Sequence, residues 1–364
     1  MLNKKEKKYI PIIAVVLGIL IGCIILIISG KNPIVMFIAL IKAGFGLDLA
    51  AGGKLNLRYL GEFLVTAMPI VLTGLSVAFA YRTGLFNIGA EGQVIVGGFA
   101  SIATAMLLPV SGPLLLIASV LAAFVAGAIW GFIPGLLKAK FNVHEVVIGI
   151  MLNYTAMYTS NYVLRSLPGS SPTRTVAVPS SASLSSEFLS GLTNGSRFHW
   201  GIVIVIIALI AVWFIIEKTT FGYGLRATGF NKEGARYAGL KVNKNVILSM
   251  MIAGGLAGLA GSLVSLGTFG YGRVFTAFDN YGFDGIAVAL VGASTAVGVF
   301  FSGLLFGLLK VAQPILQVAG IPKEIGEIIA SLIVFLVALQ FAIKYYYDKG
   351  RLLLKKNKKE GSEQ

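Results

Sequence analysis

Between two strongly apolar segments the chain carries the polar run Tyr81-Arg82-Thr83-Gly84-Leu85-Phe86-Asn87-Ile88-Gly89-Ala90-Glu91-Gly92-Gln93. The flanking segments are each long and apolar enough to cross a bilayer as a helix. A charged side chain at the centre of a membrane helix costs about 2.5–3.5 kcal/mol on insertion scales. Irregular backbone at that depth persists only where it is buried in protein or borders a water-filled cavity. The run is therefore a candidate for a transport pathway or a binding site.

The composition is that of an integral membrane protein. Of the 364 residues, 56% are hydrophobic and 12% are charged, whereas a soluble domain carries about 25% charged residues. Repeated apolar runs of about 20 residues predict helices, because the strands of a membrane barrel would alternate in character. The net charge is +15, but most lysines and arginines lie in the tails and in one loop. This distribution favours membrane topology and contact with anionic lipids over nucleic-acid binding.

The apolar runs predict an all-α polytopic fold with about ten transmembrane helices. Residues 10–29 form a run too long for an ordinary signal peptide and lack a small-residue cleavage pattern, so we expect an uncleaved first helix. A short apolar stretch, residues 34–44, fits an external surface helix better than a span. The remaining spans are expected at residues 59–81, 86–108, 113–137, 146–164, 201–216, 246–266, 283–297, 301–318 and 325–345. Between residues 283 and 320 a re-entrant segment is the alternative to a full crossing.

These spans are expected to form a single transmembrane domain with two halves. We expect cytoplasmic tails at 1–9 and 348–364, five-helix halves at 10–164 and 201–347, an external loop at 165–200 with little regular structure, and a basic cytoplasmic loop at 217–245 within the second half. In this arrangement the two tails and the basic loop lie on the same side of the membrane, and they hold most of the lysines and arginines. Because such an excess is typical of cytoplasmic segments, both termini are expected to be cytoplasmic.

The span count also indicates an internal duplication. Five spans per half would make the halves antiparallel, with the polar run opening the third span and Phe283 opening the eighth. The sequence Phe86-Asn87-Ile88-Gly89 has a loose counterpart in Phe283-Asp284-Gly285-Ile286. Inverted repeats of this kind place the substrate near the membrane midplane, at short or glycine-broken segments.

Small residues recur at four-residue spacing in several spans. The spacing predicts close helix packing, and thin backbone walls around a pathway are the alternative. The glycines concerned are Gly127, Gly131 and Gly135, then Gly254 and Gly258, then Gly303 and Gly307.

Polar and aromatic residues at the two broken segments, and at one further span, are candidates for lining the pathway. Carboxamides and carboxylates suit the polar edges of a small solute, and aromatic rings can stack on a flat one. The candidates are Phe86, Asn87, Glu91, Gln93, Asn153, Tyr154, Phe283 and Asp284. The alternative for Glu91 and Asp284 is that they only cap helix N-termini, where a carboxylate is stabilised. No catalytic or metal-binding constellation is recognisable, since His144 and His199 are isolated, and no cofactor is expected.

The basic loop at residues 217–245 has features of a docking element. Asn231 can cap a short helix that ends at Gly239, with Glu233 in its first turn. We expect Ala235, Tyr237 and Ala238 to be exposed on it and to dock into a groove on a cytoplasmic partner. The alternative is a positive-inside loop with a chance helix.

This loop resembles the cytoplasmic coupling segment of ATP-binding-cassette (ABC) importer permeases. Residues 225–230 and 233–239 look like the version found in ribose, branched-chain amino acid and nucleoside permeases, and Leu85–Gln93 and His144–Tyr154 look like the bacterial nucleoside branch. The resemblance extends over nearly the whole chain. Gly234 departs from the general motif, which has Ala after Glu. By this resemblance the ATPase-coupling residues are Leu225, Arg226, Gly229, Phe230, Glu233, Ala235, Arg236, Tyr237 and Gly239.

The resemblance implies one subunit of a heteromeric importer in the bacterial cytoplasmic membrane. Its partners would be cytoplasmic ABC ATPases, a second and non-identical permease subunit, an external substrate-binding lipoprotein and membrane lipids, with no nucleic acid. The sequence contains no G-x-x-x-x-G-K-[ST] phosphate loop, so ATP hydrolysis is expected from the partners and this chain is not an enzyme. The expected function is nucleoside import by alternating access. Alternatives are import of branched-chain amino acids or a pentose, an ion-coupled secondary transporter, and a membrane-embedded enzyme.

Overall fold

The computed structural model describes residues 6–49 and 52–339. Most of the predicted tails, and the end of the predicted last span, lie outside the described residues. The helices are α1 (Glu6–Ile28), α2 (Pro33–Phe45), α3 (Leu57–Tyr81), α4 (Ala90–Leu107), α5 (Pro113–Phe141), α6 (Glu145–Ser166), α7 (Glu187–Leu192), α8 (Gly201–Lys218), α9 (Thr220–Phe230), α10 (Lys232–Tyr237), α11 (Val242–Ser262), α12 (Tyr281–Val291), α13 (Ala296–Val318) and α14 (Glu324–Ala338). A short 3-10 turn, η2 (Ser180–Ala182), precedes α7, and a π-helical segment, η3 (Leu263–Phe269), continues α11.

The described residues form a multi-pass helical membrane protein with very little sheet. Six helices are long and apolar enough to cross a membrane, namely α3, α4, α5, α8, α11 with η3, and α13. The sheet among these residues is one antiparallel hairpin, in which β1 (Leu47–Asp48) pairs with β2 (Lys54–Leu55). The prediction of an all-α membrane fold is confirmed at this level, and the count of ten spans stays a prediction.

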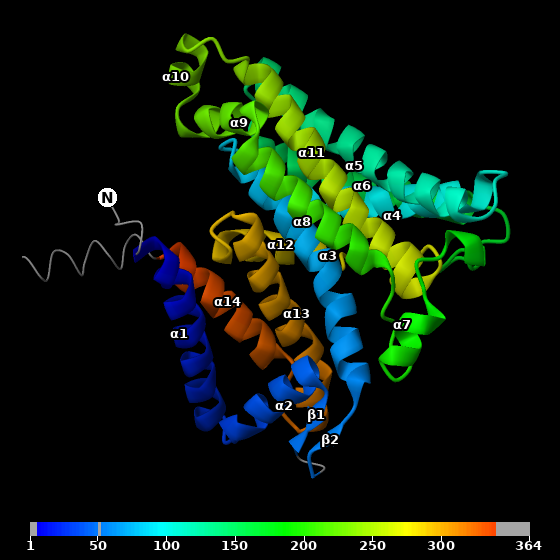
Figure 1. Ribbon diagram of the computed structural model, residues 1–364, viewed down its shortest axis with the longest axis vertical. Coiled ribbons are helices and arrows are strands. Elements are labelled where there is room, and N and C mark those ends of the chain that lie inside the picture. The colour runs from blue at the N-terminus through cyan, green and yellow to red at the C-terminus, as the bar shows by residue number, and fades with distance from the viewer. Residues whose placement is uncertain (1–5, 50–51, 340–364) are drawn as a thin grey trace, which may run out of the picture.

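The helices form two groups on either side of α3 and α8 (Figure 1). The first and last helices lie together, because α1 packs against α14 and α2 packs against α13. The second group contains α4, α5, α6 and α11. The short helices α9 and α10 project from one end of the molecule, which we call the α10 end. The β1–β2 hairpin and α7 mark the opposite end, which we call the hairpin end.

Glycines bring α5 and α11 into backbone contact, as the four-residue spacing predicts. A Cβ atom on Gly254 would lie 2.2 Å from the carbonyl oxygen of Gly127, and one on Gly127 would lie 2.3 Å from the carbonyl oxygen of Gly254. Such distances leave no room for any side chain, so the small residues set how closely the two helices approach. On the other side of the molecule, Gly303 and Gly307 of α13 meet Val71 and Ala67 of α3.

The loop at residues 165–200 is more ordered than its composition suggests. Besides η2 and α7, its backbone pairs with the segment that precedes α12. Thr175 N–H donates to the carbonyl of Gly272 and Val178 N–H donates to the carbonyl of Gly270, each at 2.9 Å. Val274 N–H donates back to the carbonyl of Thr173, also at 2.9 Å. These long-range bonds satisfy backbone groups that a free loop would leave to water.

The region after residue 280 contains a helix that is too short to span. α12 has 11 residues, so it is about 16 Å long, against a hydrocarbon core of about 30 Å. A turn follows, in which Ala293 and Ser294 adopt φ values of 49° and 50°. α13 then begins at Ala296, five residues before the predicted span. The predicted glycine-broken segment is therefore a half-length helix inside the bundle.

Candidate functional site

The polar run places a closed network of side chains at the start of α4. Asn87 Nδ2 donates to Gln93 Oε1 at 2.8 Å and to Ser76 Oγ of α3 at 3.1 Å. Gln93 Nε2 donates back to Asn87 Oδ1 at 3.2 Å. All three side chains are buried, so their hydrogen bonds satisfy one another inside the protein. This network holds the irregular backbone between α3 and α4.

A second carboxamide, Asn153 of α6, completes the start of α4. Its Oδ1 accepts from the Gly92 N–H at 2.8 Å, and its Nδ2 donates to the carbonyl of Ile88 at 3.1 Å. The first N–H groups of a helix have no partner within the helix, and α4 begins at Gly89–Ala90 without a side-chain cap of its own. Asn153 therefore supplies a cap from a different helix.

Glu91 joins the start of α4 to the start of α12. Its Oε1 accepts from the Asn280 N–H at 3.0 Å and its Oε2 accepts from the Gly282 N–H at 2.6 Å. The side chain is only 1% exposed. A Cβ on Gly282 would lie 2.2 Å from the Glu91 nitrogen, so the two backbones touch. A carboxylate at a helix N-terminus is favoured by the free N–H groups and by the helix dipole. The two broken helices thus meet N-terminus to N-terminus, with Glu91 as the cap of α12.

Asp284, one turn further along α12, faces a cavity instead. Its Oδ2 lies 2.5 Å from Nζ of Lys310 on α13, and both side chains are partly exposed. The cavity beside them measures about 760 Å³ and lies between α12, α13 and α14; we call it the α12–α14 cavity. Besides Asp284 and Lys310, its lining includes Phe283, Gln313 and Ser331. Ionisable residues within a membrane bundle are costly and mark ion or substrate pathways.

A row of aromatic rings leads from α6 to this cavity. Tyr154 packs edge-on against Phe278, with ring centroids 5.0 Å apart. Phe278 in turn packs against Phe283 at 6.1 Å. Phe283 lines the α12–α14 cavity, so the row presents aromatic surface next to the Asp284–Lys310 pair. Such surface can stack on a planar ring.

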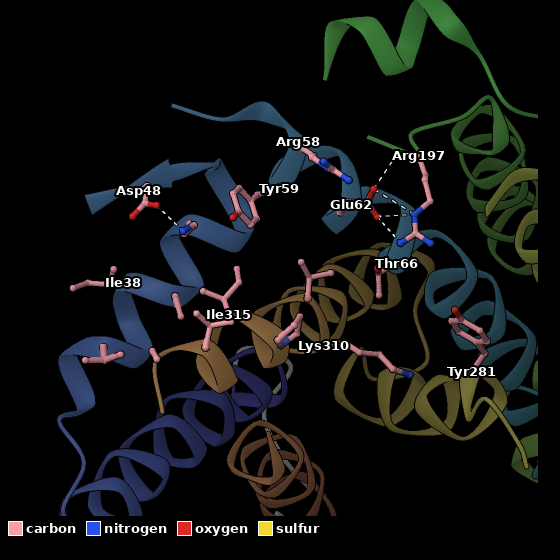
Figure 2. A pocket seen from close by; sticks show the side chains of 17 residues that line it. Ile38, Asp48, Arg58, Tyr59, Glu62, Thr66, Arg197, Tyr281, Lys310 and Ile315 are labelled. Atoms are coloured by element: carbon pink, nitrogen blue, oxygen red, sulfur yellow. Dashed lines mark hydrogen bonds and ion pairs between the residues drawn. The ribbon is translucent and has the colours of Figure 1, made fainter. Parts of the chain in front are cut away.

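A second cavity, of about 840 Å³, lies towards the hairpin end between α2, α3 and α13 (Figure 2). We call it the α2–α13 cavity. One side carries Arg58, Tyr59 and the Glu62–Arg197 pair, and the other side is apolar, with Ile38 and Ile315. Lys310 lines this cavity as well as the α12–α14 cavity, and its Nζ lies 5.1 Å from the ring centre of Tyr281. The two cavities therefore meet at one lysine.

Charged side chains at the hairpin end are mostly paired. Three nitrogen atoms of Arg197, including its backbone N–H, donate to the carboxylate of Glu62 at 2.6–3.3 Å. The hydrogen-bonded Glu62 carboxylate raises the pKa of Arg197 above its usual value. Lys42 and Asp48 lie 2.5 Å apart, and this contact raises the pKa of Lys42. One pair joins α2 to β1 and the other joins α3 to the segment before α8, both beside the α2–α13 cavity.

Comparison with known proteins identifies the family. The family described as branched-chain amino acid transport system / permease component matches residues 59–338. The chain belongs to this permease family. The guanosine ABC transporter permease protein NupP of Bacillus subtilis is 41% identical over 350 residues, which cover 96% of this chain and 98% of NupP. The nucleoside ABC transporter permease protein NupB of Lactococcus lactis is 37% identical over 96% of both chains. The glucose ABC transporter permease protein TsgB13 of Haloferax volcanii is 33% identical over 92% of this chain and 88% of its own.

At the α10 end of the permease, the basic loop folds into two short helices. Asn231 Oδ1 accepts from the Gly234 N–H at 2.9 Å and caps α10, and Gly239 follows with φ of 79°, as predicted. Ala235 was expected on the surface, and that expectation is wrong: it is 4% exposed, because it belongs to a small apolar cluster that includes Leu85 and Val246. Phe230 and Tyr237 expose the largest fractions of their side chains there, at 92% and 96%, and Tyr223 and Ala238 are exposed as well.

The other predicted coupling residues divide between the interior and the surface of the permease. Leu225 is fully buried, and Gly229 packs against the turn that follows α3. Arg226 pairs with Glu217 at 2.6 Å. Arg236 and Glu233 form an exposed pair at 3.0 Å.

Six of the eight predicted pathway residues also divide into two sets. Asn87, Glu91, Gln93 and Asn153 are buried and bonded to other protein groups, whereas Phe283 and Asp284 line the α12–α14 cavity. Tyr154 is half exposed beside Phe278, and Phe86 is half buried.

Phe278, Lys310 and Gln313 lie at the site but were not among the predicted residues. Phe278 carries no sequence signal, but Lys310 is a lone charge in the apolar run 301–318, which marks it as a functional candidate.

Metal binding and histidine chemistry find no support in the part of the chain that the structure describes. No group of three or more His, Cys, Asp or Glu side chains could hold a metal ion there. His199 is buried beside the start of α8, where its Nδ1 accepts from the Gly201 N–H at 3.1 Å. Burial, and secondarily the charge of Arg197, lowers the pKa of His199 to about 4. The ring is therefore neutral at physiological pH.

Proposed function

We propose that the chain is the transmembrane permease subunit of an ABC importer that carries nucleosides across the bacterial cytoplasmic membrane. The observation that carries this proposal is the near full-length similarity to a guanosine permease and to a nucleoside permease. Partner ATPases would supply the energy, a second and non-identical permease would complete the membrane unit, and an external lipoprotein would deliver the substrate. A sugar is the second candidate substrate, because a glucose permease is 33% identical.

The proposed substrate pathway runs through the α12–α14 cavity and past Lys310. A nucleoside offers hydroxyl groups, amide-like ring edges and a flat aromatic face. Asp284, Lys310 and Gln313 can exchange hydrogen bonds with the polar groups, and Phe283 can stack on the base. We assign Asn87, Glu91, Gln93 and Asn153 to holding the broken helices in place beside this pathway.

The proposed motor contact is the exposed surface of α9 and α10. Phe230 and Tyr237 expose apolar side chains there, as helix-in-groove recognition requires. Under this proposal both termini and the α10 end are cytoplasmic, and the hairpin end with the α2–α13 cavity faces outward. Closure of the ATPases would push on α9 and α10, and the two halves would rock about the α12–α14 cavity.

We further propose that ten membrane segments form two inverted five-helix repeats, with α1, α6, α12 and α14 added to the six long spans. Helix packing supports the repeat. α4 packs against α5 and α6, just as α12 packs against α13 and α14. α3 packs against α12 and α13, just as α11 packs against α4 and α5. Contacts that match after the two halves are exchanged are expected of a pseudo-two-fold arrangement.

Reconstitution with the cognate partners tests the proposed function. The complete transporter in proteoliposomes, with its binding protein, should take up labelled guanosine only when ATP is present on the ATPase side. Excess adenosine, glucose or leucine identifies the substrate class by competition. Uptake that persists with vanadate-inhibited ATPases would favour an ion-coupled carrier, and competition by glucose alone would assign a sugar.

Matched variants test the pathway in the same assay. Asp284→Asn should lower uptake strongly, while Glu187→Gln on the exposed surface of α7 should not. Normal uptake by Asp284→Asn would remove the α12–α14 cavity from the pathway.

A further inference from the structure

Three charged side chains link the basic loop to the turn between α12 and α13. Arg226 of α9 donates from Nη1 to Glu217 Oε2 at 2.6 Å. Arg82, after the end of α3, donates from Nη2 to Glu217 Oε1 at 3.2 Å. Arg82 also donates from Nε to the carbonyl oxygen of Ser294 at 2.9 Å. The chain of contacts therefore runs from α9 through the end of α8 to the α12–α13 turn. We call Arg226, Glu217 and Arg82 the charge relay.

The turn at the end of the relay is held in an unfavourable conformation. Ala293 and Ser294 both have positive φ, and such backbone is costly for residues that carry a Cβ atom. The turn connects α12 to α13, the two helices that present Asp284 and Lys310 to the α12–α14 cavity. A shift of this turn would therefore change the relative position of the paired side chains.

Backbone contacts reinforce the relay where α9 meets the end of α3. A Cβ atom on Gly229 would lie 2.4 Å from the carbonyl oxygen of Arg82 and 2.9 Å from the Gly84 nitrogen. α9 therefore cannot move towards the turn that follows α3, residues 82–84, without displacing that turn. A cavity of about 220 Å³ beside the relay is lined by Arg82, Glu217 and Ser294, among others, and leaves space into which the α12–α13 turn can shift.

We propose that the charge relay transmits movement of α9 to the α12–α13 turn, with Glu217 as the positioning residue at its centre. The inference rests on the proposed function, because it requires a motor that moves α9. Stability does not account for the arrangement, since partly exposed ion pairs contribute little to folding. Each oxygen of Glu217 is held by a different element, so the carboxylate couples the position of α9 to that of the α3 end. The α12–α13 turn, with its two residues of positive φ, is the candidate for an element that changes between two conformations during this coupling.

The ratio of substrate imported to ATP hydrolysed tests the relay in the reconstituted transporter. Glu217→Gln should lower this ratio about fivefold or more, with ATP hydrolysis, complex assembly and thermal midpoint close to wild type. Arg82→Gln combined with Glu217→Gln should be no worse than the more severe single variant, because both act in one chain. Glu187→Gln is the matched control. If Glu217→Gln fails to assemble, Arg82→Gln carries the same prediction, because Arg82 makes the contact with the α12–α13 turn. An unchanged ratio in an assembled variant would overturn the relay.

A conformational readout separates the relay from the proposed function. Cys23 is the single cysteine of the chain, so Val297→Cys in a Cys23→Ser background introduces one reactive thiol at the exposed first turn of α13. ATP should change its labelling rate by a membrane-impermeant maleimide, and Glu217→Gln should abolish the change. A change that persists in Glu217→Gln would overturn the relay alone. If ATP changes the labelling rate neither with nor without Glu217→Gln, the importer mechanism is overturned together with the relay.

Discussion

Replacing Glu91 by glutamine should destabilise the permease by about 2–4 kcal/mol. Both carboxylate oxygens accept backbone N–H groups of the α12 start, at 3.0 and 2.6 Å, in a site that is 1% exposed. A hydrogen bond to a charged group contributes about 1.5–3 kcal/mol and a neutral one about 0.5–1.5 kcal/mol. Glutamine keeps one acceptor oxygen, but its NH₂ group must face the other backbone N–H, which then has no partner. The loss of one charged bond and the weakening of the other give the stated range.

The assay is thermal unfolding of the purified permease in detergent, followed by the loss of the monodisperse peak in size-exclusion chromatography. The Glu91→Gln midpoint should fall clearly, and uptake in proteoliposomes should fall in proportion to the folded fraction. Glu187→Gln, an exposed carboxylate in the first turn of α7, should change stability by less than about 1 kcal/mol. A Glu91→Gln protein with the wild-type midpoint but no uptake would refute this reasoning, because Glu91 would then act on substrate and not on the helix junction.

Three further outcomes follow from the described contacts. Lys310→Met should lower uptake at least about tenfold, or 1.4 kcal/mol, by leaving Asp284 unpaired in the cavity, whereas Lys323→Met at the exposed start of α14 should not; equal uptake by both would contradict it. Gly254→Val should lower the thermal midpoint by the equivalent of about 1–3 kcal/mol or more, because its side chain would meet the α5 backbone; an unchanged midpoint would show that α5 and α11 can separate freely. The folded-state pKa of His199 is about 4, below the ordinary value of about 6.5 for a histidine. Its contribution to the unfolding free energy should therefore be constant above about pH 6.5 and fall by up to about 1.4 kcal/mol per pH unit towards pH 4. Thermal midpoints measured across this pH range should show the fall in the wild type and should lack it in His199→Leu.

Much of the fold class could be predicted because hydrophobicity along the chain is a local property. A bilayer requires long apolar helices wherever the chain crosses it, so the runs of apolar residues placed most of the observed helices within a few residues. The cap at Asn231 and the stop at Gly239 were also readable, since both depend on neighbouring backbone groups. The four-residue spacing of glycines that begins at Gly127 and at Gly254 indicated close helix packing, because residues four apart lie on one face of a helix.

The functional assignment of individual side chains was less predictable, because it depends on partners that are distant in sequence. The run around Glu91 was recognisable as an unusual polar element between two spans, but nothing in it reveals that the carboxylate accepts N–H groups 189 and 191 residues away. Ala235 has a surface-like neighbourhood in sequence and is nevertheless buried against α11. Lys310 stands out as a charge in an apolar run, but only the packing of α12 on α13 provides Asp284 as its partner.

The amino-acid sequence by itself determined that this chain is a helical membrane protein with a polar, glycine-broken element between two spans. It did so because solvation by lipid acts on each segment separately. Tertiary structure alone decided which polar residues build the helix junctions and which line a cavity. The physical reason is that a buried carboxylate or amide takes whichever donor or acceptor helix packing brings within about 3 Å, and that partner is fixed by the whole bundle.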